Sequence, residues 1–188
     1  LASSLTAVDC SRRAVSSISD MKLALQRRAA SIPVNGWVRG HGHDEAFLVE
    51  GRHPTREDLD AAVPARFVRL DDRTGHACVL NSRALELVGI TALTPDPVDG
   101  VIQRDEAGRP TGVLFEMNNW VSSRIARQTN ESSEGAEAAN RILISNGVTS
   151  FQDASPANDF DRFETLRGMK QEGRLASRVT VMPGIRHL

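Results

Sequence analysis

Two histidines separated by a single glycine, His41-Gly42-His43, form the motif of this sequence with the clearest chemical potential. On an extended segment the side chains at positions i and i+2 point to one face, so both imidazoles could bind one metal ion, as in many catalytic zinc sites. Asp44 and Glu45 follow directly and offer carboxylates, but no third ligand stands at a recognisable spacing. The sequence leaves open a metalloprotein centred on His41 and His43, and it favours a solvated loop.

A third histidine, His76, lies in a stretch (residues 69–85) where polar side chains gather between an apolar segment and a predicted helix. The apolar segment ends in a charged turn, Gly75 precedes the histidine, and Asn81 or Ser82 is placed to cap the helix. Polar groups at such a transition are typical of the active-site edge of α/β proteins. The simpler interpretation is a connection in which His76 only satisfies backbone groups.

Two carboxylates occupy comparable positions at the ends of predicted strands. Glu116 ends the second arm of a predicted hairpin and begins a helix, where the helix dipole alone would favour it. Asp153 follows a predicted parallel strand, so it would face the active site of a barrel or cap the next helix. Cys10 and Cys78 lack a neighbouring base, and no phosphate loop or nucleophile elbow is present. Taken alone, these residues do not assemble a catalytic site.

The elements that must position these residues follow from hydrophobic periodicity, caps, glycines and prolines. Helices are expected near residues 17–29, 55–63, 82–88, 116–128, 133–146 and 159–172. Strands are expected near residues 5–9, 34–39, 67–70, 148–152 and 178–182, with a hairpin joining 101–104 to 111–115 and a loop over 41–53. The last third alternates helix and strand, as parallel βα units do. The hairpin and irregular loops of the middle third suit an inserted lobe.

The overall composition excludes several classes of protein. The 188 residues are 40% hydrophobic and 25% charged, with a net charge of −1, whereas binders of nucleic acids or membrane surfaces rest on a basic excess. No run is long enough for a transmembrane helix, and the first residues lack the pattern of a signal peptide. The two cysteines are too few for a disulfide scaffold, which points to a reducing, cytoplasmic compartment.

Several motifs in order resemble the metal-dependent amidohydrolase superfamily, in its YtcJ-like branch, which includes N-substituted formamide deformylases. They are Gly36-Trp37-Val38-Arg39-Gly40, Asp44-Glu45, Pro54-Thr55-Arg56-Glu57-Asp58-Leu59-Asp60, Gly75-His76-Ala77 and Asn81-Ser82-Arg83-Ala84-Leu85. Two later segments agree with that branch: Asp105 to Glu116, similar to "D-G-P-T-G-V-L-x-E", and Gly147 to Ala154, similar to "G-[IV]-T-S-x-x-D-A". The resemblance spans nearly the whole chain.

The resemblance implies an α/β fold, a partial (β/α)₈ barrel with an inserted α+β lobe. Residues 1–40 would be an early barrel βα segment, 41–130 the lobe with its hairpin, and 131–188 barrel βα units. It also implies hydrolysis of C–N bonds by a metal-bound hydroxide, with a divalent metal, zinc foremost, in the full-length parent. The family's metal ligands would lie outside this chain, so no metal is expected within it. The motif at His41 and His43 falls at a variable position, so no metal role is transferred to it.

For the site, the resemblance places His76 beside the substrate pocket as a hydrogen-bond donor that orients a small amide-type substrate. It places Glu116 and Asp153 toward the barrel mouth. We expect a fragment that is inactive alone. The alternatives are a non-catalytic module that binds small molecules or partners, and the metalloprotein described above. Because missing strands would leave open sheet edges, we also expect a homo-oligomer.

Overall fold

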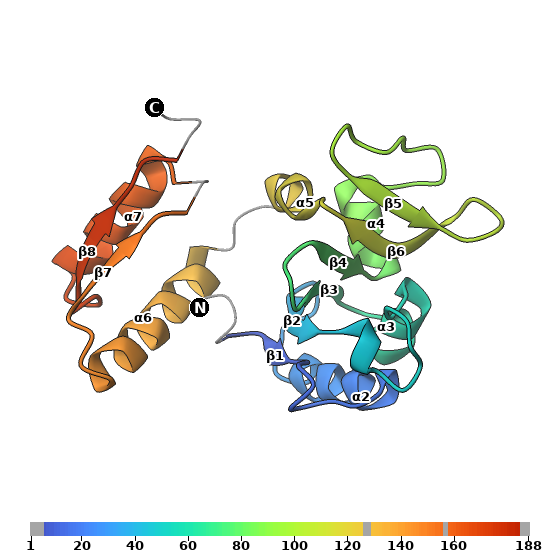
Figure 1. Ribbon diagram of the computed structural model, residues 1–188, viewed down its shortest axis with the longest axis horizontal. Helices are drawn as coiled ribbons and strands as arrows, with labels where there is room; N and C mark the ends of the chain where they lie inside the picture. Colours follow the sequence, from blue (N-terminus) through green and yellow to red (C-terminus); the bar gives the residue numbers. More distant parts are fainter. Residues whose placement is uncertain (1–5, 126–128, 156–157, 185–188) are drawn as a thin grey trace. The chain divides into compact units, whose positions relative to one another are not determined.

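The computed structural model describes residues 6–125, 129–155 and 158–184, with side chains omitted over 129–134. The chain divides into two compact units, each coloured by sequence in Figure 1. Ala7–Arg127 forms one, here called the sheet unit, and Leu1–Thr6 together with Gln128–Leu188 forms the other, here called the C-terminal unit.

The sheet unit is built on one six-stranded sheet, in the order β1-β2-β3-β4-β6-β5. Its strands are β1 (Val8–Asp9), β2 (Trp37–His43), β3 (Phe67–Asp72), β4 (Ala77–Leu80), β5 (Val101–Arg104) and β6 (Pro110–Phe115). The first three strands are parallel, and the remaining pairings are antiparallel. This mixed sheet with its helices confirms the predicted α/β class, and the predicted hairpin is the antiparallel pair β5–β6.

Both faces of the sheet are buried under helices. Consecutive strand residues point to opposite sides, so a single strand can contribute side chains to both apolar clusters. Along β4, Cys78 and Leu80 belong to one apolar cluster and Val79 to the other. Helices α2 (Ile18–Ala29) and α3 (Arg56–Ala62) supply the cluster around Val79. Helices α4 (Ser82–Val88) and α5 (Asn118–Arg124) supply the other cluster.

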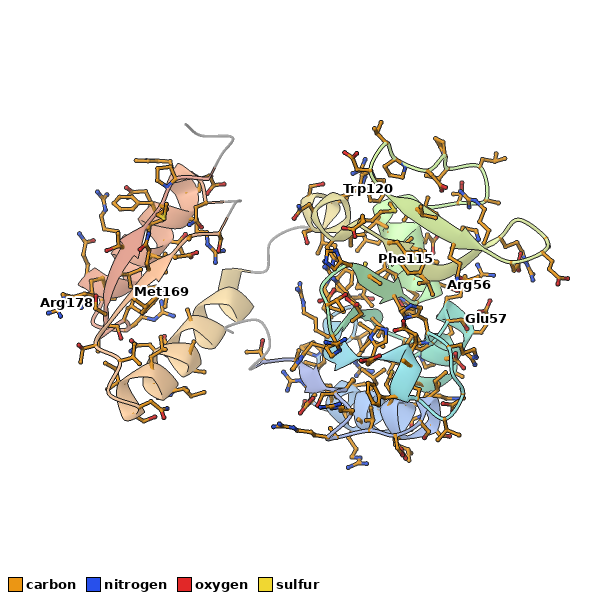
Figure 2. All side chains as sticks on the ribbon, viewed as in Figure 1. Arg56, Glu57, Phe115, Trp120, Met169 and Arg178 are labelled. Carbon is orange, nitrogen blue, oxygen red and sulfur yellow. The ribbon has the colours of Figure 1, made fainter. Side chains whose placement is uncertain are left out.

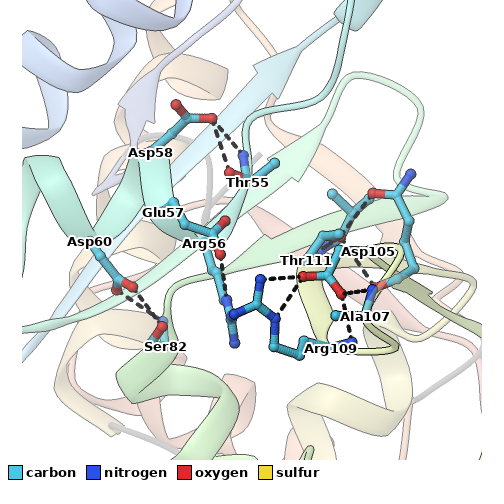
Figure 3. Close-up of polar contacts among 12 residues, drawn as sticks. Thr55, Arg56, Glu57, Asp58, Asp60, Ser82, Asp105, Ala107, Arg109 and Thr111 are labelled. Carbon is cyan, nitrogen blue, oxygen red and sulfur yellow. Dashed lines mark hydrogen bonds and ion pairs between the residues drawn. The ribbon is translucent and has the colours of Figure 1, made fainter. Parts of the chain in front are cut away.

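Polar side chains fix the starts of α3 and α4, and some of these contacts are shown in Figure 3. The Asp58 carboxylate accepts a hydrogen bond from the backbone N–H of Thr55 at 2.8 Å, as its capping position predicts. The Asn81 side chain accepts from the N–H of Ala84 and so caps α4. Asp60, in the second half of α3, accepts from Ser82, the first residue of α4, and so joins the two helices.

The C-terminal unit contains a parallel βαβ arrangement, as its helix–strand rhythm predicts. Its elements are α6 (Thr129–Ser145), β7 (Ser150–Asp153), α7 (Phe160–Gln171) and β8 (Arg178–Val181). Strands β7 and β8 pair in parallel, and α7 connects them. Met169 of α7 is buried in this unit (Figure 2).

Some elements differ from the expected ones. Strand β2 continues past Gly40 to His43, where a loop was expected, because β3 beside it supplies hydrogen-bond partners as far as Asp72. The short apolar run after His76 is strand β4. The helix expected over 116–128 is α5, which begins only at Asn118, and its last expected residues lie outside the described ones. The division at residues 40 and 130 stays a prediction about the whole protein.

Candidate functional site

A cavity of about 200 Å³ lies in the sheet unit at the edge where β2 and β3 end. The two strands are parallel, and their last residues, His43 and Asp72, are register partners. The carboxyl edge of parallel strands is where α/β proteins gather ligand-binding groups. The cavity is lined by His43, Asp44, Glu45, His53, Asp72, Arg73, Thr74, His76, Ala77 and Phe115.

His41 and His43 do not share a face, contrary to the expectation from their spacing. Gly42 adopts a positive φ of 86° and forms a bulge, so His41 pairs with Asp71 and His43 pairs with the next residue of β3. Neighbouring residues of β3 point to opposite faces, and the two histidines therefore do so as well. His43 lines the cavity and His41 does not.

His43 is completely buried and has a hydrogen-bond partner on each ring nitrogen. Its Nδ1 lies 3.2 Å from the carbonyl oxygen of Asp71, and its Nε2 lies 3.2 Å from Nδ1 of His53. A carbonyl only accepts, so Nδ1 of His43 carries the hydrogen and Nε2 is the acceptor. Burial lowers the pKa of His43, and the neighbouring charge of a protonated His53 lowers it further. The ring is therefore neutral at neutral pH.

His53, which the sequence motifs do not single out, completes a chain of contacts along the cavity wall. Its Nδ1 donates to His43, and its Nε2 lies 3.7 Å from a carboxylate oxygen of Glu45. The edge of its ring meets Phe115 of β6, whose side chain is labelled in Figure 2. The side chain is 14% exposed, so it borders the cavity without being sealed inside.

The turn between β3 and β4 is organised around the carboxylate of Asp72. It accepts hydrogen bonds from the backbone N–H groups of Thr74, Gly75 and Ala77, and from the hydroxyl of Thr74. Partial burial acts to raise the pKa of Asp72, but these hydrogen bonds outweigh it and hold the pKa below the usual range. The charged carboxylate thus fixes the backbone that carries His76.

His76 and Glu116, both singled out from the sequence, are in direct contact. Nδ1 of His76 donates to a carboxylate oxygen of Glu116 at 2.7 Å, and the N–H of Glu116 donates to the carbonyl of His76 at 2.7 Å. Both side chains are exposed. The carboxylate orients the imidazole and leaves its Nε2 for a ligand. The carboxylate does not act at a helix start, because α5 begins two residues later.

A buried arginine ties this contact to the sheet. The Arg69 guanidinium bonds Asp71 at 2.8 Å, Ser122 at 2.9 Å and Asn118 at 3.1 Å. The Asn118 amide in turn donates to the carbonyl of Gly75. Helix α5 and the turn before His76 are therefore held by one network. From the sequence, an Arg69–Asp71 pair is suggested only because the two residues lie two positions apart.

The third predicted residue, Asp153, belongs to the C-terminal unit and is described within that unit. It ends β7, and its carboxylate accepts hydrogen bonds from the N–H and hydroxyl of Ser155. Arg162 lies 3.4 Å from it. Partial burial raises the pKa of Asp153, but the bonds from Ser155 outweigh burial and lower it overall. Within its own unit Asp153 stabilises the turn after β7.

Neither the two cysteines nor a cluster of metal-ligating side chains adds a reactive group to the described residues. Burial raises the pKa of the Cys10 and Cys78 thiols to about 12, so neither supplies a thiolate at neutral pH. Among residues 6–125, 129–155 and 158–184, no group of three metal-ligating side chains is close enough to hold an ion. What the cavity can do is bind and orient a small polar molecule through His76 and its neighbours.

Similarity to known proteins is strongest over part of the chain. It is 41% identical over 109 residues to N-substituted formamide deformylase of Arthrobacter pascens, covering 58% of this chain and 20% of that protein. It is 39% identical over 103 residues to the putative amidohydrolase YtcJ of Bacillus subtilis (strain 168), covering 55% of this chain and 20% of that protein. The matches thus span about a fifth of the length of these curated relatives.

The fold is also found in a solved structure described as an uncharacterized metal-dependent hydrolase from Pyrococcus furiosus. The TM-score is 0.66 and the identity 28%, over 95% of this chain and 34% of that one. The model of the amidohydrolase family matches residues 3–187. The two curated relatives represent the branch that the sequence motifs indicated. This chain therefore belongs to the amidohydrolase family, in its YtcJ-like branch.

Proposed function

We propose that this chain forms part of the substrate site of a hydrolase that cleaves C–N bonds in small amide-type molecules. Membership of the amidohydrolase family supports the reaction class, and the name of the Arthrobacter relative supports the bond type. The observation that carries the proposal is the contact between His76 and Glu116 beside a cavity at the carboxyl edge of the sheet.

In this proposal His76 orients the substrate and Glu116 positions His76. With Nδ1 committed to the carboxylate, Nε2 donates a hydrogen bond to a carbonyl oxygen when the ring carries its second proton. The network through Asp72 and Arg69 keeps the backbone of His76 in place before a ligand arrives. Asp153 is proposed to face the mouth of the barrel, since it ends a parallel strand.

We also propose that the chain contributes to a partial (β/α)₈ barrel with an inserted lobe, which the parallel strands β1–β3 and the β7–α7–β8 unit support. The family implies a divalent metal, with zinc foremost. The described residues do not fit one, because they contain no group of three suitable ligands and the facing nitrogens of His43 and His53 point at each other. We assign the metal to the whole protein and no step to it here.

We also propose a cytoplasmic location and a small-molecule partner. A cytoplasmic location fits two cysteines that are free and buried. None of the described helices has the length and apolar character needed to cross a membrane. The partner is a small molecule, and the near-zero net charge gives no support to a nucleic-acid partner. The isolated 188 residues are expected to bind the substrate class without hydrolysing it.

A binding titration tests the role of His76 directly. We expect an N-alkyl formamide added to the ¹⁵N-labelled chain to shift the backbone amide signals of residues 72–77 and 115–116. His76→Ala should abolish these shifts, and Glu116→Gln should weaken binding by about fivefold, because a neutral partner orients the ring less strongly.

His41→Ala is the matched control, since His41 lies in the same sheet but does not line the cavity. It should bind like the unchanged chain. In the whole protein, His76→Ala should lower kcat/KM by about 10- to 100-fold. Binding that survives His76→Ala would contradict the proposal. Binding with the expected pattern but no hydrolysis by the whole protein would favour a non-catalytic small-molecule-binding module.

A further inference from the structure

His43 and His53 form a buried contact between two parts of the sheet unit that meet at the cavity. His43 ends β2, and His53 lies at the end of the connecting segment 44–53, which contains a single 3-10 turn, Glu45–Phe47. The two residues are ten positions apart, and both line the cavity. The contact therefore holds this connecting segment against the edge of the sheet.

The geometry of the pair is that of one hydrogen bond between the two facing ring nitrogens, one of which carries a hydrogen while the other accepts it. The rings are nearly perpendicular, at 80°, and their centroids are 5.4 Å apart while the facing nitrogens are 3.2 Å apart. This centroid distance is near the largest that such a nitrogen separation allows, so the two nitrogens point at each other. Since the Asp71 carbonyl takes the hydrogen on Nδ1 of His43, the shared hydrogen belongs to His53.

The charges around the pair come from several elements. Glu45 faces Nε2 of His53, and Asp72 lies near His43 on β3. Asp44 is paired with Arg73 at 2.7 Å, and His76 lines the same cavity. The carboxylates of Glu45 and Asp72 favour a proton on the pair, whereas the burial of His43 disfavours a charge on its ring.

We propose that the His43–His53 pair is an acid-sensitive latch: when both rings become protonated, the part of segment 44–53 beside the cavity is released from the cavity wall. When both rings are fully protonated, the two facing nitrogens are both donors and the bond between them is lost. His43 is completely buried, so its charged ring gains water only if the segment opens. The inference rests on the fold of the sheet unit alone and does not depend on what the cavity binds.

Opening would be local because other anchors of the segment do not involve histidine. The N–H of Val49 donates to the carbonyl of Ser16, and both carboxylate oxygens of Glu50 accept from the N–H of Ile18 at the start of α2. These contacts keep the middle of the segment on α2. Asp44 is also held, by its ion pair with Arg73, so the part beside the cavity that moves is Glu45 to Phe47 and His53.

The direction of the pH effect follows from linkage. The pKa of His43 in the folded chain is lowered below its ordinary value of 6.5, so the unfolded or opened state binds the extra proton more readily. The latch is fully closed above that ordinary value, and it weakens as the pH falls below it. The conformational consequence appears on the acid side of neutrality.

Hydrogen exchange of backbone amides tests the latch on the 188-residue chain. Between about pH 8 and about pH 5.5, after correction for intrinsic exchange, we expect the amide of Phe47 to lose at least about tenfold in protection. The amides of Val79 and Leu114 in the centre of the sheet should keep theirs. Imidazole ¹⁵N signals should show His43 protonated on Nδ1 at the higher pH.

His53→Gln is the informative variant, because a glutamine amide can donate to neutral His43 and can turn its oxygen toward charged His43. It should remove most of the acid-dependent loss of protection without unfolding the chain. His76→Gln, which changes the other cavity histidine, should retain the loss. Equal protection at both pH values in the unchanged chain would overturn the proposal, as would an unaltered acid response in His53→Gln. Neither result bears on whether the cavity binds an amide.

Discussion

At the scale of single residues, Glu116 combines a predicted role with an unfavourable backbone. Its φ of 55° lies in the left-handed region, which a non-glycine residue other than asparagine or aspartate seldom adopts. This conformation turns the chain from β6 toward α5 and places the carboxylate on His76. Strain of this kind is found at functional sites, where the surrounding structure maintains it.

Replacing Glu116 with glycine should separate stability from binding. Relief of the left-handed strain, less the added flexibility of the unfolded chain, should raise the free energy of unfolding by up to about 1 kcal/mol. Binding of the N-alkyl formamide should weaken more than in Glu116→Gln, because glycine leaves no acceptor for Nδ1 of His76. Denaturant unfolding followed by circular dichroism measures the first effect. Asn35→Gly, at a φ of 68°, is the control and should gain less, because asparagine tolerates this region. A destabilised Glu116→Gly would show that the contact with His76 outweighs the strain.

The sequence could name His76 and Glu116 separately, but it could not predict their contact. The contact depends on the register of β4 against β6, in which Ala77 pairs with Phe115 and so sets the preceding and following residues side by side. His53 carried no local signal at all, because its partner is reached only after the bulge at Gly42 redirects His43. Non-local register and a bulge decide both cases.

At the scale of elements, α3 packs closely against β6 and leaves space only for glycine. A Cβ added to Gly112 would lie 2.5 Å from the carbonyl oxygen of Leu80 and 2.9 Å from the backbone nitrogen of Arg56, with φ already at 96°. Neither backbone atom can move aside as a side chain would. The approach of α3 to the hairpin therefore depends on this glycine; Figure 3 labels Arg56 of α3 and Thr111 of the hairpin.

Gly112→Ala should lower the free energy of unfolding by more than about 2 kcal/mol, through left-handed strain combined with overlap in a packed site. Gly108→Ala in the same hairpin is the matched control. It has a similar positive φ of 76° but open space around it, so only the strain, about 1 kcal/mol, should remain. Urea unfolding of both variants measures the difference. Equal losses would mean that the packing around Gly112 yields at little cost.

Local signals explain why most elements could be predicted. The Thr55–Asp58 cap, the left-handed Gly89 after α4, and the turn at Asp105 each act within a few residues, and all three occur as expected. Strand β2 was expected to stop at Gly40, which usually interrupts strands. It continues because β3 supplies backbone partners as far as Asp72, and a glycine stands at position 40 because a Cβ there would lie 2.7 Å from the Leu70 side chain. Long-range packing of this kind leaves no periodic trace in sequence.

At the scale of the whole molecule, apolar groups remain exposed in the part of the chain that the structure describes. Phe160 is 73% exposed and Phe163 41% exposed on α7, where their rings also contact each other. Strand β1, two residues long, is the edge of the parallel side of the sheet in the sheet unit, and among the described strands of the C-terminal unit β7 pairs with β8. Large apolar surfaces and open edges of this kind favour association with other chains.

We therefore predict that the 188-residue chain forms a homodimer or a larger homo-oligomer in solution. Light scattering should give at least twice the mass of one chain, and the association should persist in high salt, because burial of apolar surface is not screened. Phe160→Asp should shift the equilibrium toward the monomer, since a charge opposes burial of that helix face. Val98→Asp, at a fully exposed apolar residue outside α7, is the control and should leave the mass unchanged. A monomer at all concentrations would contradict the prediction, and equal effects of the two variants would place the interface away from α7.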